Sequence, residues 1–393
     1  MAAVPFAILA VALFFSATGS TLERVYLAAF PALLALRLGL GHGRAPGYLL
    51  LGSALAVGGV VAWFFTSSNG PGTGEPFPLV ERVRYGVLLA GVASLPLAGL
   101  FLFRGRVRRL VALAILVTLY LPVAFVALQV HRPHVRRGWP PRQRPEPREV
   151  EVQARDGATL RGWYIAGRAR GSPLVMLLHG IGSSRADQVH AARAHVELGH
   201  AVAMMDGRGH GESDGMTVSF GLREKDDVRR IIDVLTHGDR NLPVALQGCS
   251  MGAAIALQAA AENPQVRAVI AEAPFYDLEE MARQSVRWLP GLLARAGIGV
   301  FRAIAPLELG GELDEVSPAA AVRRRPDLKT LFIVGGRDHV IPPSHGRRLH
   351  RIAAGPSELW DLPNAEHCGA WAAAPEEYPR KTTGFLRAAL ARN

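Results

Sequence analysis

The chain has 393 residues with a formal net charge of +11, and hydrophobic residues make up 49% of it. The arginines that give this charge are scattered or follow apolar segments, without the aromatic-interleaved stripe of a nucleic-acid binder, so we expect no nucleic-acid partner. The two cysteines are too few for a disulfide framework and lack metal-ligand spacing, and we expect neither a metal nor a cofactor.

The first 130 residues are almost wholly apolar and predict an all-α transmembrane domain of about five spans. The apolar stretches are 4–18, 25–40, 48–66, 87–103 and 110–130. A soluble helical domain would need amphipathic faces, which these stretches lack. A cleaved signal peptide would account only for the first stretch. We therefore expect a multi-pass membrane protein with the lipid bilayer as a partner.

Residues 131–149 form a predicted juxtamembrane linker that is basic and rich in proline. Its prolines favour an extended chain, and its arginines favour contact with anionic headgroups. An odd number of spans would put the two ends of the chain on opposite sides of the membrane. Arginines are more numerous on the side of the C-terminal domain, which favours the cytoplasmic face for that domain.

Residues 150–393 have the pattern of a soluble domain in which strands alternate with helices. Two alternating segments flank the turn signal Asp156-Gly157 and predict a β-hairpin. Further strands are predicted at 174–178, 201–205, 242–246, 266–271 and 331–334, and helices at 226–235 and 253–262. This alternation predicts a mostly parallel, doubly wound α/β sheet.

The segment Gly248-Cys249-Ser250-Met251-Gly252 joins a predicted strand to a predicted helix. The Gly-x-Ser-x-Gly pattern in this position is that of a nucleophile elbow, a sharp turn that presents the serine hydroxyl at the carboxyl end of a parallel sheet. The glycines are needed because side chains at the flanking positions would clash where helix and strand approach. A chance glycine-rich turn is the alternative, so the neighbouring motifs must decide.

Three further motifs accompany the elbow in chain order: His179-Gly180, the Asp-x-Arg-Gly-x-Gly-x-Ser pattern at 206–213, and Glu-Ala-Pro-Phe at 272–275. Together they make residues 150–390 resemble the α/β-hydrolase superfamily, most closely its serine aminopeptidase-like and lipase/esterase-like members, some of which are membrane-anchored. The resemblance implies an α/β-hydrolase fold with a small helical cap, expected at about 276–329. It does not extend to the predicted membrane spans.

The resemblance also implies the other catalytic residues, because the chain order in this fold is Ser, acid, His. Asp338 follows the predicted strand 331–334, on the loop where the family carries its acid. His367 near the C-terminus is the predicted base, and His339 is its rival. In this triad Ser250 attacks a carbonyl carbon, His367 moves the proton, and Asp338 holds the imidazole tautomer.

The backbone amides of Ile181 and Met251 are the predicted oxyanion hole, since one follows His179-Gly180 and the other follows the nucleophile. Asp206 and Arg208, like His179, are expected to order the loops around the site rather than to act in catalysis.

Cys249 and Cys368 each neighbour a predicted catalytic residue. A cysteine replaces the nucleophile in a nearby branch of the fold, but Cys249 occupies an x position of the elbow and should face away. Both cysteines are therefore interpreted as small packing residues.

The sequence thus predicts a membrane-anchored serine hydrolase that cleaves a carboxylic ester. The predicted cap is apolar, with helices interrupted at Pro290-Gly291 and at Gly297, and an apolar cap beside a membrane favours an acyl or lipid-like substrate. A serine aminopeptidase, an amidase and a thioesterase remain alternatives on the same triad. A catalytically idle binding module is disfavoured because the triad is intact. The oligomeric state is left open.

Overall fold

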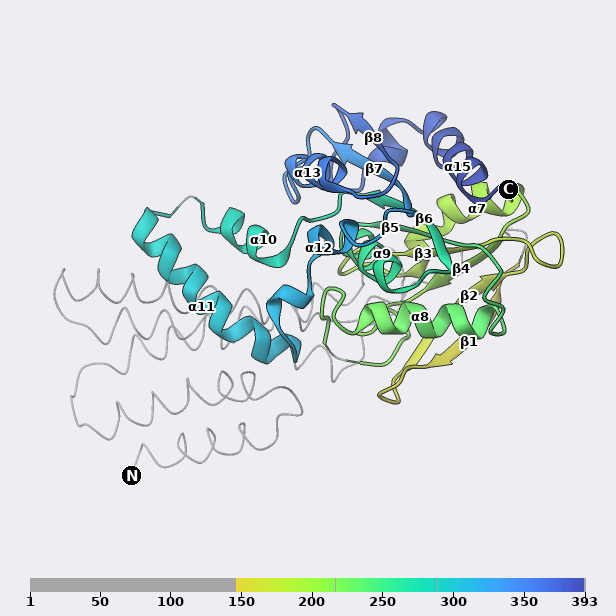
Figure 1. The fold of residues 1–393 in the computed structure, drawn as a ribbon, viewed down its shortest axis with the longest axis horizontal. Coiled ribbons are helices and arrows are strands. Elements are labelled where there is room, and N and C mark those ends of the chain that lie inside the picture. The colour runs from red at the N-terminus through yellow and green to blue at the C-terminus, as the bar shows by residue number, and fades with distance from the viewer. Residues whose placement is uncertain (1–145, 216, 288, 392–393) are drawn as a thin grey trace, which may run out of the picture. The chain divides into compact units, whose positions relative to one another are not determined.

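The computed structural model describes residues 146–391, apart from 216 and 288 (Figure 1). The predicted membrane domain at 1–130 and most of the predicted linker at 131–149 lie outside these residues and stay predictions. Within the described part of the chain, no helix is both long enough and apolar enough to cross a bilayer.

An eight-stranded sheet forms the frame, with the strand order β1-β2-β4-β3-β5-β6-β7-β8. The strands are β1 (Arg148–Gln153), β2 (Thr159–Ile165), β3 (Leu174–Leu178), β4 (Ala201–Met205), β5 (Val244–Cys249), β6 (Val266–Glu272), β7 (Lys329–Gly335) and β8 (Ser357–Leu362). The pairs from β4-β3 through to β7-β8 are parallel, whereas β1-β2 and β2-β4 are antiparallel. The predicted hairpin and the mostly parallel sheet are therefore confirmed.

The burial of each strand explains whether the strand can be predicted from the sequence. Every residue of β3 and β4 is buried, so their sequences are continuous apolar runs. Strand β8 lies at the edge of the sheet and pairs only with β7. Of its residues only Trp360 is buried, and its mixed Ser-Glu-Leu-Trp-Asp-Leu sequence gives no comparable signal. Strand β8 is accordingly absent from the strands predicted from the sequence.

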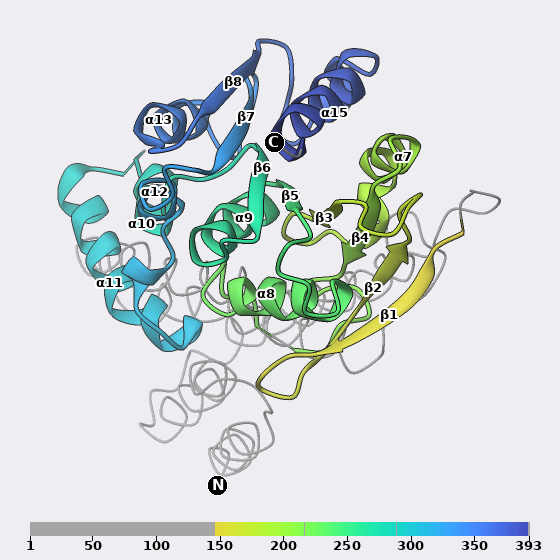
Figure 2. The ribbon, with the colours of Figure 1, turned by 45° about the vertical axis from the view of Figure 1, so that its right-hand side comes forward.

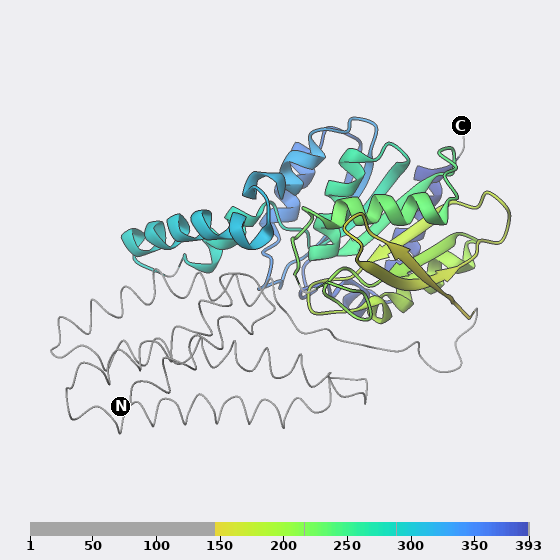
Figure 3. The same ribbon diagram turned by 90° about the horizontal axis from the view of Figure 1, so that it is seen from below.

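Helices cover both faces of the sheet (Figure 2). They are α7 (Val189–Glu197), α8 (Glu224–Leu235), α9 (Met251–Glu262), α10 (Leu278–Ser285), α11 (Gly291–Leu309), α12 (Pro318–Val322), α13 (Ser344–Ile352), α14 (Ala370–Ala373) and α15 (Glu377–Leu390), with short 3₁₀ turns at Arg185–Gln188 and Leu313–Glu315. Helices α7 and α15 share the core of one face, and α8, α9, α12 and α13 share the core of the other. At the antiparallel end, α8 contacts β1 (Figure 3).

The order of the strands fixes where a site can form. Strand β3 lies between β4 and β5, and the chain winds outwards from it in both directions. Ligand sites of such sheets lie outside the carboxyl ends of the strands at the point where the winding reverses. The loop that begins at His179 leaves β3 there, and Ser250 directly follows β5 at the same point.

The predicted cap segment contains α10, α11 and α12, and these helices do not all belong to the same compact unit. Helix α12 packs against α9 and α13, so it belongs to the core. Arg283–Gly310, which includes α11, falls in a separate compact unit. Helix α11 begins after Pro290, as the sequence predicts, but it continues through Gly297. A single glycine costs a helix only about 1 kcal/mol, too little to end one of 19 residues.

A buried histidine on α7 should make the fold sensitive to acid. The His195 side chain is fully buried, its Nε2 atom lies 2.7 Å from Gln247 Oε1, and burial lowers its pKa to about 4. The unfolded chain therefore binds a proton that the folded chain does not, between pH 6.5 and 4. Stability should fall by about 3 kcal/mol as the pH is lowered through this range.

Urea unfolding at a series of pH values measures this slope. The variant His195→Gln should flatten it, although it also weakens the fold at neutral pH. The matched control is the exposed His339, whose replacement by Gln should leave the slope unchanged. An equally steep loss of stability in His195→Gln would show that other groups cause the sensitivity to acid.

Candidate active site

The turn between β5 and α9 holds Ser250 in an unusual backbone conformation. Its dihedral angles are φ 56° and ψ −119°, a region that residues other than glycine rarely occupy. The Ser250 amide donates a 2.8 Å hydrogen bond to the carbonyl oxygen of Glu272 at the end of β6, which fixes the turn against the neighbouring strand. The expected nucleophile elbow is therefore present in the fold.

Two glycines allow the helix to approach the sheet closely enough for this turn. A Cβ atom on Gly252 would clash with the carbonyl oxygens of Leu178 and His179 at the end of β3. A Cβ atom on Gly248 would lie 2.6 Å from the backbone nitrogen of Ala253 in α9. The backbones of helix and strand are thus in direct contact on both sides of Ser250, and the steric reason expected for the glycines is confirmed.

Asp338, His367 and Ser250 form a continuous chain of hydrogen bonds. His367 Nδ1 lies 2.8 Å from Asp338 Oδ2, and His367 Nε2 lies 3.0 Å from Ser250 Oγ. A carboxylate can only accept, so Nδ1 carries the ring proton and Nε2 is free to accept the serine proton. Asp338 Oδ1 accepts from the amides of Val340 at 2.9 Å and Ile341 at 2.8 Å, which fixes the orientation of the carboxylate.

The structure therefore brings together the three residues that the sequence singled out. His339, the rival base, does not join these three residues. Its side chain is exposed to solvent, whereas Asp338 beside it is buried.

The loops that carry the acid and the base are in backbone contact. A Cβ atom on Gly335 would lie 2.5 Å from the carbonyl oxygen of Ala365, and one on Gly336 would lie 2.5 Å from that of Pro363. The Arg337 amide also donates to Ala365 O at 2.9 Å. The Gly335-Gly336 pair thus lets the base loop lie directly on the acid loop, which sets the distance between Asp338 and the imidazole.

The two amides predicted as an oxyanion hole lie on segments that flank Ser250. Met251 is the first residue of α9, where helical amides have no intrahelical acceptor. On the other side, a Cβ atom on Gly180 would lie 3.5 Å from the Cβ of Ser250, and Ile181 is the next residue. Both segments leave the sheet at its carboxyl edge, beside the serine hydroxyl.

His179 connects the loops after β3 and β4. Its Nε2 accepts from the amide of Gly207 at 2.9 Å, so Nδ1 carries the proton and donates to the Gly180 carbonyl at 2.8 Å. Asp206 accepts from the amides of Arg185 at 2.8 Å and Glu212 at 3.0 Å. These contacts agree with the loop-ordering roles expected for both residues.

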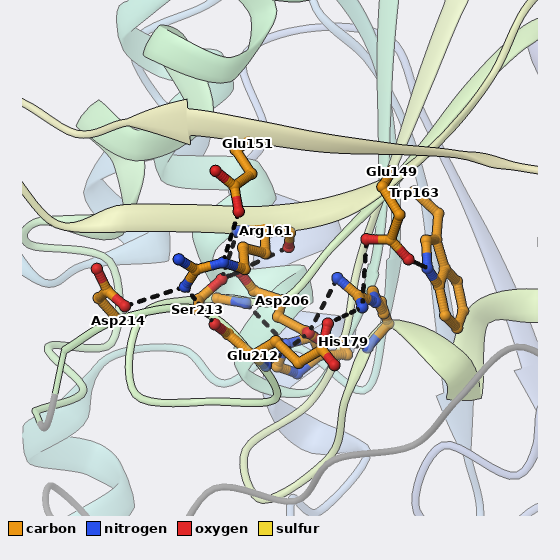
Figure 4. Close-up of polar contacts among 11 residues, drawn as sticks. Glu149, Glu151, Arg161, Trp163, His179, Asp206, Glu212, Ser213 and Asp214 are labelled. Carbon is orange, nitrogen blue, oxygen red and sulfur yellow. Dashed lines mark hydrogen bonds and ion pairs between the residues drawn. The ribbon is translucent and has the colours of Figure 1, made fainter.

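Hydrogen bonds and ion pairs also connect the loop after β4 to the β1-β2 hairpin. Arg161 on β2 donates to Glu151 at 2.9 Å and to Asp214 at 3.0 Å, and Ser213 Oγ donates to the Asp206 carbonyl at 2.7 Å (Figure 4). Arg208 pairs with both oxygens of the buried Asp227, at 2.7 and 2.6 Å, and with Asp156 at 2.8 Å. Asp206 and Arg208 of the Asp-x-Arg-Gly motif thus order the loops, as expected from the sequence.

Glu272 was recognised from the sequence only as part of a motif, and the structure gives it a specific place. Its Oε1 accepts from the amide of Ala370 at 2.9 Å, and its Oε2 accepts from the Tyr378 hydroxyl at 3.2 Å. Burial raises the pKa of the carboxyl group. Because its carbonyl also holds the Ser250 amide, Glu272 links the elbow to the segment after His367.

Cys249 and Cys368 form a disulfide, with their Cα atoms 5.9 Å apart and a separation of 119 positions in the sequence. The interpretation of both as packing residues is wrong. Each cysteine considered alone is a small apolar residue, but the pair flanks two side chains that must touch in a triad. Contact between Ser250 and His367 brings the segments beside them near each other, so the positions of the two cysteines were a sequence signal for the pairing that the structure shows.

In the part of the chain that the structure describes, no group of three or more His, Cys, Asp or Glu side chains is placed to hold a metal ion.

Comparisons with known proteins bear on the family and the fold. The family model for serine aminopeptidase, S33, matches residues 170–300, which include the elbow. The uncharacterized protein Rv2307c of Mycobacterium tuberculosis is 30% identical over 226 residues, which are 57% of this chain and 73% of the relative. The α/β hydrolase domain-containing protein WAV2 of Arabidopsis thaliana is 24% identical over 250 residues, 61% of this chain and 78% of the relative.

Among solved structures, the esterase Pf2001 of Pyrococcus furiosus superposes with a TM-score of 0.55 and 23% identity, covering 67% of this chain and 99% of the esterase. This likeness shows the fold, whereas the sequence relatives and the family model show descent. The chain therefore belongs to the α/β-hydrolase superfamily, among the serine hydrolases related to the serine aminopeptidases.

Proposed function

We propose that this protein is a membrane-anchored serine hydrolase that cleaves carboxylic esters of acyl, lipid-like substrates through Ser250, His367 and Asp338. The observation that carries the proposal is the hydrogen-bonded chain from Asp338 through His367 to Ser250, at 2.8 and 3.0 Å. It lies where the winding of the sheet reverses, with the serine on a strained elbow.

In the proposed reaction Ser250 Oγ attacks the ester carbonyl carbon while His367 Nε2 accepts its proton. The carbonyl oxygen becomes an oxyanion, which accepts hydrogen bonds from the amides of Ile181 and Met251. The protonated His367 then donates its proton to the leaving alkoxide, and the acyl group stays on Ser250. A water molecule, deprotonated by the same imidazole, attacks the acyl-enzyme, and the acid leaves as Ser250 regains its proton.

The ester substrate is supported by the neighbours in fold. The Pyrococcus furiosus protein is named an esterase, and acetyl xylan esterase 1 from Thermoanaerobacterium superposes with a TM-score of 0.51 and 20% identity. The description of the matching family model supports a second candidate, release of amino acids from peptides by the same triad. The two reactions share the acyl-enzyme and differ in the acyl group and the leaving group that the site accepts.

Anchoring in the membrane is part of the proposal. It is supported by the apolar stretches within residues 1–130 and by the basic linker that follows them. A lipid-like substrate would gain from this placement, because it could partition from the bilayer into a nearby site, whereas a soluble peptide would not.

Replacing the nucleophile or the base should abolish catalysis. Ser250→Ala and His367→Ala should each lower kcat for p-nitrophenyl esters by roughly 10⁴-fold or more, because the two residues act as a unit. The matched control His339→Ala should keep kcat, since that side chain is exposed and outside the hydrogen-bonded chain. Circular dichroism of each variant checks that the fold is retained. Loss of activity in His339→Ala with activity kept in His367→Ala would reverse the assignment of the base.

A series of p-nitrophenyl esters tests the substrate class. Each methylene that enters an apolar pocket adds up to about 0.8 kcal/mol, so kcat/KM should rise by up to about fourfold per methylene until the pocket is full. Amino-acid p-nitroanilides are the matched substrates for the aminopeptidase candidate. A flat or falling chain-length profile, together with efficient release of amino acids, would contradict the ester proposal and favour the second candidate.

A further inference from the structure

The disulfide lies closer to the reacting groups than a general stabilising cross-link needs to be. Cys249 directly precedes Ser250, and Cys368 directly follows His367. The bond therefore closes a small ring that includes the 3.0 Å contact between His367 Nε2 and Ser250 Oγ. Any movement of the base away from the serine has to deform this ring.

The backbone around the base is strained and needs support. Cys368 has a φ of 53°, in the left-handed region that side chains disfavour. Ser250 at the other end of the ring has a φ of 56°. Such conformations persist only where the surrounding contacts hold them. The disulfide connects the two strained segments directly, so each supports the other.

Other contacts hold the base loop less completely. On its amino side, the loop is bound to the acid loop through Arg337 N and Ala365 O at 2.9 Å, and the His367 imidazole is bound to Asp338 Oδ2 at 2.8 Å. On its carboxyl side, the hydrogen bond from Ala370 N to Glu272 begins three residues after His367. The loop follows β8, an edge strand with a single neighbour in the sheet. These contacts bind the base loop to the acid loop and to Glu272, whereas the disulfide binds it to the elbow itself, so loss of the disulfide should let His367 shift relative to Ser250.

We propose that the Cys249–Cys368 disulfide is a positioning element of the active site, and that hydrolysis depends on its being oxidised. This inference deepens the proposed function and rests on it for the identity of the reacting groups. Neither cysteine touches the scissile bond, and they act through His367 and Ser250. Neither cysteine residue is fully buried. Reduction by a dithiol breaks the S–S bond, yields two thiols and converts the reductant to its cyclic disulfide.

Reduction of the whole chain in detergent gives a clean test, because these are the only two cysteines in the sequence. After treatment with dithiothreitol, kcat for a p-nitrophenyl ester should fall on the order of tenfold to 100-fold, since a shift of about 1 Å between reacting groups has that effect. KM should stay within about twofold, because the proposed role of the disulfide is to position His367 against Ser250 and not to bind the substrate. Reoxidation with oxidised glutathione should restore kcat.

The variant with Cys249→Ser and Cys368→Ser is the matched control. It should have the low kcat of the reduced protein and should not respond to dithiothreitol. Near-UV circular dichroism on the same reduced samples separates positioning from folding. A reduced protein that keeps its kcat would overturn the proposal, and so would one that loses activity only because its tertiary structure is lost.

Labelling separates this proposal from the proposed function. A fluorophosphonate needs the activated serine but no ester substrate. If the oxidised protein hydrolyses no ester yet labels with the probe, and the labelling rate falls on the order of tenfold on reduction, the ester assignment fails and the positioning role stands. If ester hydrolysis is found and neither rate changes on reduction, the proposed function stands and the positioning role fails.

Discussion

Direct contact between the backbones of α9, β3 and β5 is the constraint on which the rest of the site depends. Ser250 can hold φ 56° only because Gly248 and Gly252 leave no side chain between helix and strand. The same turn begins α9 at Met251, which brings a helical amide without an intrahelical acceptor next to the serine hydroxyl. One steric requirement thus sets both the direction of the nucleophile and one side of the proposed oxyanion hole.

The base has to be brought to this turn from a distant part of the chain, and several contacts converge to do so. The Gly335-Gly336 pair lets the base loop lie on the acid loop. Glu272 accepts from Ser250 through its carbonyl and from Ala370 through its carboxyl group. Cys368 is bonded to the elbow itself. The fold therefore surrounds the pair of reacting side chains with backbone contacts, a buried carboxyl group and a covalent bond.

The sequence revealed those parts of the site that depend on local rules. Ser250 and its glycines were predicted from the Gly-x-Ser-x-Gly pattern of a single turn. Asp338 and His367 were predicted from the order Ser, acid, His along the chain of this fold. Strand β8 could not be recognised, because an edge strand with one buried side chain lacks an apolar run. Glu272 needed the structure, because its partners, Ala370 and Tyr378, lie about 100 residues further along the chain. The disulfide also bears on which side of the membrane the hydrolase domain would face. Disulfides persist on the oxidising side of a membrane, whereas the arginine pattern of the sequence favours the cytoplasmic face.

In the proposed mechanism the folded chain activates Ser250 through His367. Reaction of the native protein with a fluorophosphonate, followed by digestion and peptide mass spectrometry, tests it most directly. We expect one adduct per chain, on the peptide that contains Ser250, and none when the protein is first unfolded in urea, because an isolated serine hydroxyl is a weak nucleophile. An adduct on any other residue, or equal labelling of the unfolded chain, would show that His367 does not activate Ser250.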